Sequence, residues 1–166
     1  CIIFATGFEV GTDYSRRAGY QIHGSDGLTV SQKWGDGLST FHGMHSRGFP
    51  NSFFFGPAQS GFTATYTYSL DEQSIHLAYI LKKAKEQGAT RIEASEEAEE
   101  KWINTIVEKA RLTATFQENC TPGYYNNEGK VNQTPQNNTY GGGPIEFFSL
   151  MKKWRTKDNL EGLELS

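Results

Sequence analysis

The chain has 166 residues, of which 36% are hydrophobic and 13% aromatic, so it is long enough to form the core of one domain. Its formal net charge of −3 at pH 7 provides no broad basic surface, which argues against nucleic acid as a partner. It has no apolar run of about 18 residues and no signal-peptide pattern, so we predict no membrane span and expect a cytoplasmic protein. Its two cysteines, Cys1 and Cys120, do not make a disulfide framework.

The first predicted element is a strand at residues 1–8, an apolar run that ends in a turn at Gly7. Such a run is typical of a fully buried parallel strand, which needs neighbouring strands on both sides and helices on both faces. No residues precede it in this sequence to provide them. We therefore expect an α/β protein of which this chain is the C-terminal piece, so that part of the chemistry lies outside it.

Two short elements are predicted in the next part of the chain. Residues 20–31 predict a hairpin, because Gly24 and Gly27 bound a polar four-residue turn between two short strands. Residues 52–55 predict a second buried strand that ends abruptly at Gly56.

Three helices are predicted in the rest of the chain. The first covers residues 63–87, and its expected buried stripe is Tyr66, Leu70, Leu77, Leu81 and Ala84. Ser95 is expected to cap the second helix, whose expected buried face is Ala98, Trp102, Ile103, Ile106, Val107 and Ala110. A long loop over residues 112–143 follows, and Pro144 is expected to open the last helix. The apolar side of that helix is expected to be Phe147, Phe148, Met151 and Trp154.

The segment around Gly56 has the order of a dinucleotide-binding site: a strand, a Gly56-Pro57 turn, a loop of mostly small residues at 58–65, and a helix. A helix start presents unpaired N–H groups and the positive end of the helix dipole. It therefore favours a phosphate group or the electron-rich edge of a reduced flavin. The same order also occurs at ordinary strand–loop–helix corners, and the residues alone favour that simpler interpretation.

Four motifs along the chain resemble those of class B flavoprotein monooxygenases. Residues 5–8 resemble their Ala-Thr-Gly-Phe/Tyr strand, and residues 48–57 resemble their Gly-Phe-Pro-Asn strand and flavin-side loop. Residues 69–73 resemble the helix that follows, and residues 140–143 match their C-terminal Tyr-x-Gly-Gly. Within this class, the Baeyer–Villiger monooxygenases fit best. The resemblance covers nearly the whole chain.

The resemblance implies the C-terminal portion of a Rossmann-like, two-domain fold that binds FAD and NAD(P), with added helices and a long loop. Residues 1–88 would belong to the FAD-binding domain and the adjoining NADP-binding domain, and residues 89–166 would form an extension over the active site. The family uses FAD and NADPH to insert one oxygen atom from O2 next to a ketone carbonyl, which gives an ester or lactone. The implied partners are a small-molecule ketone, O2 and the N-terminal part of the same polypeptide.

The resemblance carries over a limited set of site residues. The cofactor-binding residues that it implies are Ala5, Thr6, Gly7, Gly56, Pro57, Gln59 and Thr63. The substrate-pocket residues that it implies are Phe62, Thr63, Thr65 and Phe116, the last at a position where many members carry a Trp. No catalytic residue is carried over, because this sequence lacks the Gly-x-Gly-x-x-Gly fingerprints, the family's signature segment and its catalytic arginine.

Two other interpretations stay open at this point. The chain could belong to an N- or S-oxygenating class B flavoprotein, or it could be a free-standing, non-catalytic binding module. His42 and His45 lie three residues apart, but no cysteine or carboxylate cluster accompanies them, so we predict no metal site. We expect His76 to be a surface or packing residue.

Overall fold

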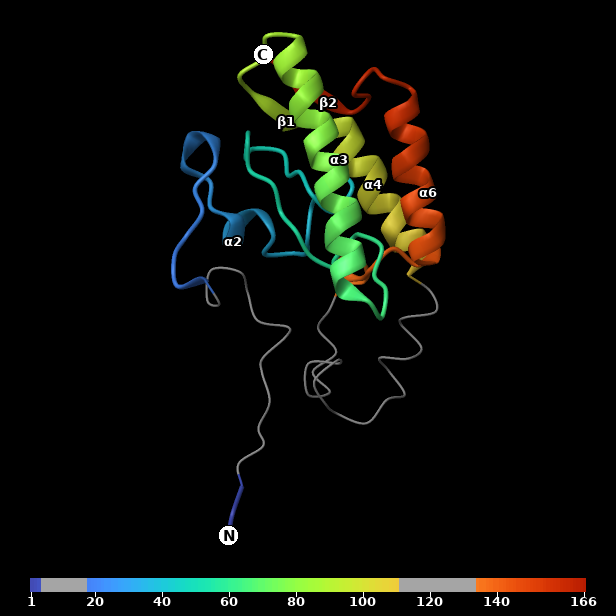
Figure 1. Ribbon diagram of the computed structural model, residues 1–166. Coiled ribbons are helices and arrows are strands. Elements are labelled where there is room, and N and C mark those ends of the chain that lie inside the picture. The colour runs from blue at the N-terminus through green and yellow to red at the C-terminus, as the bar shows by residue number, and fades with distance from the viewer. Residues whose placement is uncertain (4–17, 111–133) are drawn as a thin grey trace.

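The computed structural model describes residues 1–3, 18–110 and 134–166, where helices predominate and one small sheet is present (Figure 1). The three long helices are α3 (Tyr66–Glu86), α4 (Glu96–Lys109) and α6 (Gly143–Thr156). The short helical segments are the 3-10 turns η1 (Ser25–Gly27) and η3 (Pro135–Asn137) and the helix α2 (Val30–Lys33). The sheet consists of β1 (Ile92–Ala94) and β2 (Leu163–Leu165), which pair antiparallel with Ile92 opposite Leu165.

Local signals start the helices where the sequence predicts. The Ser95 hydroxyl accepts a hydrogen bond from the Ala98 N–H at 3.2 Å, which satisfies one of the free donors at the start of α4. Glu96 and Glu97 follow in the first turn, where negative charge suits the helix dipole. Pro144 lies in the first turn of α6, as expected from its fixed φ angle and missing N–H.

The main core lies where α3, α4 and α6 meet the small sheet. Its buried residues are Phe41, Ile80, Ala84, Ile92, Ala94, Trp102, Ile106, Tyr140, Phe147, Met151, Trp154 and Leu160. A smaller cluster of Val30, Phe49 and Phe54 lies beside α2. The predicted division of the chain at residue 88 stays a prediction, and the main core contains residues from both sides of it.

The strands predicted at residues 1–8 and 52–55 are wrong where the structure describes them. Ile2 and Ile3 are 82% and 83% exposed and lie in no strand, because no described segment pairs with them; residues 4–8 lie outside the described part of the chain. Residues 52–55 are irregular, and the Phe54 N–H donates to the Met44 carbonyl instead of joining a ladder of strand hydrogen bonds. The strands β1 and β2 were not predicted, because each has only three residues and they pair across about seventy positions.

The hairpin at residues 20–31 is only partly formed. A single antiparallel bridge joins His23 to Thr29, and η1 occupies the turn. The second predicted strand is replaced by α2, because Thr29 and Gln32 form a reciprocal capping box that favours a helical turn.

The predicted inner faces of two helices also need correction. The buried residues of α3 are Ser69, Gln73, His76, Ile80 and Ala84, whereas Tyr66 and Leu81 of the predicted stripe are 40% and 43% exposed. Three of the five buried residues are polar. Ser69 and Gln73 make hydrogen bonds, and the His76 ring packs on Trp154, so their burial is compensated. In α4, Trp102 and Ile106 are buried as predicted, but Val107 is exposed and Glu99 is buried. The inner side of α6 is confirmed by Phe147, Met151 and Trp154.

None of the helices in the described part of the chain is both long and apolar enough to cross a membrane.

Candidate functional site

The candidate site is the loop at residues 56–65, which leads into the N-terminus of α3. Its first half is held to that helix by a closed set of hydrogen bonds. The Gln73 amide Nε2 donates to the Gly56 carbonyl at 2.9 Å and to the Ser60 hydroxyl at 3.0 Å. The Ser60 hydroxyl donates in turn to the Gly56 carbonyl at 2.5 Å. Ser60 and Gln73 are 0% and 3% exposed, so this anchor is shielded from water.

Gln59 ties the same loop to three other parts of the chain: residues 38–40, α4 and η3. Its φ of 53° lies in the left-handed region, which a non-glycine residue adopts at some energetic cost. Its side chain is fully buried, accepts from the Thr40 hydroxyl at 2.5 Å and donates to the carbonyls of Leu38 and Gln136 at 2.7 and 2.8 Å. Its backbone carbonyl accepts from the indole Nε1 of Trp102 at 3.1 Å. Every polar group of the Gln59 side chain therefore has a partner inside the protein.

A turn at residues 40–46 packs against the loop at Ala58 and Gln59. The backbone of Phe41 bridges to that of His45, and Gly43 sits at the tip with a φ of +72°. A Cβ atom at Gly43 would lie 2.9 Å from the Ala58 carbonyl oxygen, so only glycine allows this turn to approach the loop so closely.

The outer side of the loop is apolar and aromatic. Pro57 is exposed, and the rings of Phe55 and Phe62 are 37% and 47% exposed. The centroids of the Phe62 and Tyr66 rings lie 6.0 Å apart, so the aromatic surface continues onto the first turn of α3. Exposed aromatic rings in one place commonly mark a surface that binds a ligand or another protein segment.

The start of α3 has no side-chain cap. Thr65 occupies the N-cap position, but its hydroxyl accepts no hydrogen bond from the first turn. The Thr63 hydroxyl donates to the Thr65 carbonyl at 2.7 Å, and the Thr63 N–H donates to the Ser69 hydroxyl at 3.3 Å. The positive end of the α3 dipole therefore lies beside the exposed aromatic rings.

The structure brings together the predicted site residues that it describes, because Gly56, Pro57, Gln59, Phe62, Thr63 and Thr65 all lie on this one loop. Their contacts with a cofactor or substrate stay predictions. Ala5, Thr6, Gly7 and Phe116 lie outside the described residues. Sequence reasoning missed Gln73, which anchors the loop. The signal was available, since Ser69, Gln73, His76 and Ile80 are spaced by four, three and four residues and therefore share one face of a helix.

The three histidines near the loop form a buried cluster. The ring centroids of His42 and His76 lie 5.5 Å apart, and both rings pack on Trp154. Burial lowers the pKa of His45 to about 4, and burial, with smaller effects of His45 and Arg155, lowers the pKa of His76 to about 3. Burial also lowers the pKa of His42 well below 6.5. These imidazoles are therefore neutral at pH 7.

No group of three metal-ligating side chains among the described residues is placed to hold a metal ion. His76 Nδ1 lies 3.3 Å from Arg155 Nη1, and because a guanidinium only donates, this nitrogen must accept. The histidine cluster is therefore part of the packing beneath the loop.

Arg47 has a structural role as well. Its guanidinium donates to the Ala94 carbonyl of β1 at 3.0 Å and pairs with Glu164 of β2. These two contacts join the residue that follows the turn at 40–46 to both strands of the sheet. Buried Glu99 of α4 accepts from the Arg47 N–H and from the Lys33 ammonium, each at 2.8 Å. These contacts place the charge of Arg47 on the sheet side of the turn.

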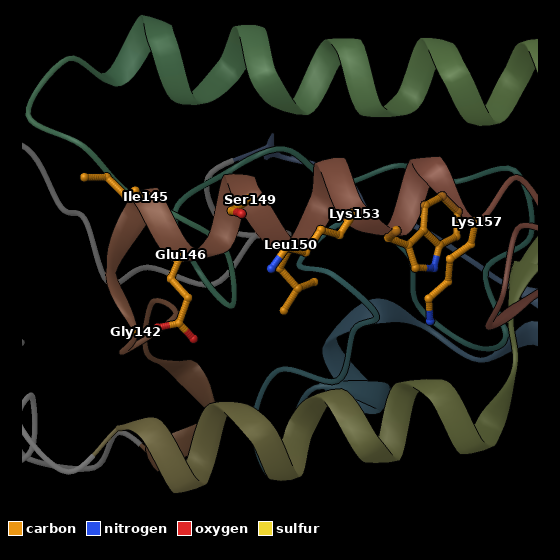
Figure 2. Close-up of a pocket in the computed structure, with 8 residues that line it drawn as sticks. Gly142, Ile145, Glu146, Ser149, Leu150, Lys153 and Lys157 are labelled. Atoms are coloured by element: carbon orange, nitrogen blue, oxygen red, sulfur yellow. The ribbon is translucent and has the colours of Figure 1, made fainter.

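A groove of about 710 Å³ runs along the surface of α6 (Figure 2). Leu150, Trp154, Lys153 and Lys157 contribute to its walls. None of the predicted site residues lines it, so this groove is separate from the candidate site.

No protein-family model matches this chain. It is 45% identical to neopentalenolactone D synthase of Streptomyces avermitilis, over 99% of this chain and 28% of that protein. It is 36% identical to the Baeyer–Villiger monooxygenase ATR8 of Stachybotrys chlorohalonatus, over 99% of this chain and 27% of that protein.

The solved structure of the polycyclic ketone monooxygenase from Thermothelomyces thermophila has a similar fold. It superposes with a TM-score of 0.85 at 31% identity and covers 92% of this chain and 25% of the other. Other relatives are named FAD-binding monooxygenases, and other solved structures of similar fold carry bound NADP. The chain spans between a quarter and three tenths of the length of these relatives.

Sequence and fold together make this chain similar, over nearly its whole length, to a segment of the class B flavin monooxygenases. The similarity extends from the first residues through the loop at 56–65 to the last helix, so it does not depend on one motif. Among the relatives of 30% identity or more are proteins named Baeyer–Villiger monooxygenases.

Proposed function

We propose that this chain is the C-terminal segment of an FAD-containing, NADPH-dependent Baeyer–Villiger monooxygenase. The whole enzyme would insert one oxygen atom from O2 next to a ketone carbonyl and release an ester or lactone. The observation that carries the proposal is the 45% identity over 99% of the chain. The architecture that goes with it is the C-terminal part of a Rossmann-like two-domain fold, preceded by the rest of the same polypeptide in a cytoplasmic enzyme.

The loop at 56–65 fits one face of a flavin ring. The isoalloxazine is a flat, largely apolar ring system with a polar pyrimidine edge. The exposed rings of Phe55 and Phe62 and the exposed Pro57 offer it an apolar surface, and the uncapped start of α3 offers N–H donors to the polar edge. The described residues contain no glycine-rich phosphate loop, so the diphosphate of FAD would be held by the preceding part of the polypeptide.

The chain's own residues would position the reactants rather than react. FAD supplies the oxygen-transfer chemistry when it is bound. Phe62, Thr63 and Thr65 would shape the ketone pocket and exclude water from it. The buried anchors of Gly56 and Gln59 would keep this wall rigid, since both sides of the loop are hydrogen-bonded to the body of the molecule.

A chimera tests the proposal. The C-terminal quarter of the Thermothelomyces thermophila enzyme would be replaced by this chain, because the two superpose over 92% of it. We expect the purified chimera to contain FAD and to convert a polycyclic ketone to a product one oxygen atom heavier when NADPH is added. A flavin-free chimera would contradict the proposal.

The same chimera separates the two competing interpretations. Oxygenation of amines or sulfides without conversion of ketones would favour the N- or S-oxygenating class. A chimera that folds but binds no FAD would favour a free-standing, non-catalytic binding module.

A further inference from the structure

We propose that Gln73 is a positioning residue that holds the loop at 56–60 in the shape against which the flavin lies. This inference rests on the proposed function, because the loop matters for catalysis only if a flavin packs on it. The structure shows three linked groups, the Gln73 amide, the Gly56 carbonyl and the Ser60 hydroxyl, all removed from water.

The orientation of the Gln73 amide follows from its partners. The Gly56 carbonyl can only accept, so the amide nitrogen of Gln73 must face it. The Ser60 hydroxyl uses its hydrogen on the same carbonyl and therefore accepts from Gln73 through a lone pair. Both hydrogens of the Gln73 amide nitrogen are consequently used. Its Oε1 is buried without a partner among the described residues.

The amide thus sets the direction of the peptide that precedes Pro57. The pyrrolidine ring fixes the φ angle of Pro57, so the orientation of the Gly56 carbonyl largely decides where the ring of Pro57 points. Gln73 also joins the two ends of a short loop, Gly56 and Ser60, to one point on a long helix. Loss of these two hydrogen bonds would let the loop change its conformation while the helix and the core stay in place.

The loop has a second, independent anchor that keeps the fold intact in such a variant. The side chain of Gln59 reaches residues 38, 40 and 136, and its backbone is bonded to Trp102 and Asn138. Gln73 is therefore dispensable for holding the loop to the body. What it adds is the conformation of residues 56–57, on the exposed side.

Two substitutions at one position provide the test in the chimera. Gln73→Met keeps the length of the side chain but removes both donated hydrogen bonds, together with the unpartnered oxygen. Gln73→Glu loses the donors when it is ionised, and recovers one O–H donor for the Gly56 carbonyl when it is protonated. Ser74→Ala is the matched control, because Ser74 is exposed on the next position of the same helix.

The measurement is the FAD dissociation constant and the visible flavin spectrum between pH 5.5 and 8.5. We expect Gln73→Met to bind FAD about tenfold more weakly at every pH, since a loop that has lost two hydrogen bonds must be ordered by the ligand. Gln73→Glu should bind weakly at pH 8.5 and approach wild type at pH 5.5. Ser74→Ala should match wild type throughout.

The histidines packed on this side of α3 do not account for the pH dependence of FAD binding that we expect for Gln73→Glu. His76 and His42 are buried, and their lowered pKa values keep both imidazoles neutral above pH 5.5. Expressing each variant relative to wild type at the same pH removes any shared effect of other groups.

Two results would overturn the inference. The first is that Gln73→Met binds FAD as tightly as wild type. The second is that Gln73→Met and Gln73→Glu bind FAD equally weakly at every pH and also melt at lower temperatures, which would indicate a merely structural role. Hydrogen exchange on the 166-residue chain provides a readout without flavin. Faster exchange at residues 56–62 in Gln73→Met, with α4 and α6 unchanged, supports the inference, and unchanged exchange refutes it. A wild-type chimera without FAD would count against the proposed function, while the exchange result still decides the role of Gln73.

Discussion

The buried histidines should make this fold sensitive to acid, and His45 allows the effect to be measured. Its pKa is about 4 in the folded protein, against 6.5 for an ordinary histidine. Below pH 6.5 the unfolded chain therefore binds a proton that the folded chain does not. The stabilisation is complete above pH 6.5 and falls as the pH drops toward 4. Linkage gives about 1.4 kcal/mol per pH unit, so His45 alone should account for a loss of about 2 kcal/mol between pH 7 and pH 5.

The assay compares urea unfolding at pH 7 and pH 5, followed by tryptophan fluorescence. Trp102 and Trp154 report on the main core, where both are buried. His45→Gln cannot titrate, so its free energy of unfolding should fall by about 2 kcal/mol less than that of wild type over this range. Ser74→Ala, an exposed substitution that removes no titratable group, should retain the wild-type pH dependence. Equal acid sensitivity of wild type and His45→Gln would refute the reasoning.

Three further outcomes follow from the described contacts. Glu99→Gln removes the charge from a buried side chain that accepts from Lys33 and Arg47, and it should lower the free energy of unfolding by about 2 kcal/mol. The control Glu100→Gln, at an exposed position, should change it by less than about 0.5 kcal/mol. Similar values for both variants would contradict a stabilising role of Glu99. Gly141→Ala places a Cβ atom against the Lys109 backbone oxygen at the end of α4 and should lower the melting temperature, whereas Gly35→Ala meets nothing closer than 3.4 Å and should not. In the chimera, Phe62→Ala should change the ratio of kcat/KM for bulky and small ketones more than it changes FAD content; parallel loss of both would place Phe62 elsewhere.

The helices could be predicted because their signals are local. Ser95 with Glu96 and Glu97, and Pro144 with its apolar spacing, lie within one or two turns of the ends that they define. The strands could not be predicted in this way. The apolar run at 52–55 resembles a strand, but a strand exists only if another segment supplies its hydrogen bonds. The true pair, β1 with β2, joins segments that are far apart in sequence.

The candidate site was located by resemblance, and its construction was not foreseen. The motif around Gly56 identified the loop, but its anchors come from Gln73 on the next helix, from Trp102 on α4 and from Gln136 near α6. The expected contact of Gln59 with a cofactor stays a prediction. The structure shows that its side chain is hydrogen-bonded within the protein. A polar residue in a loop carries no sequence signal that would have shown these hydrogen bonds.

The sequence by itself determined the three long helices, the Ser95 cap of α4 and the resemblance to a family, because these depend on residues close together or on motifs in a set order. Only the tertiary structure decided which faces are buried, which histidines are neutral and what holds the loop. These properties depend on contacts between segments far apart in the chain, where hydrogen bonds and burial outweigh local preference. The apolar stripe predicted for α3 is partly exposed for this reason, while Ser69, Gln73 and His76 lie inside.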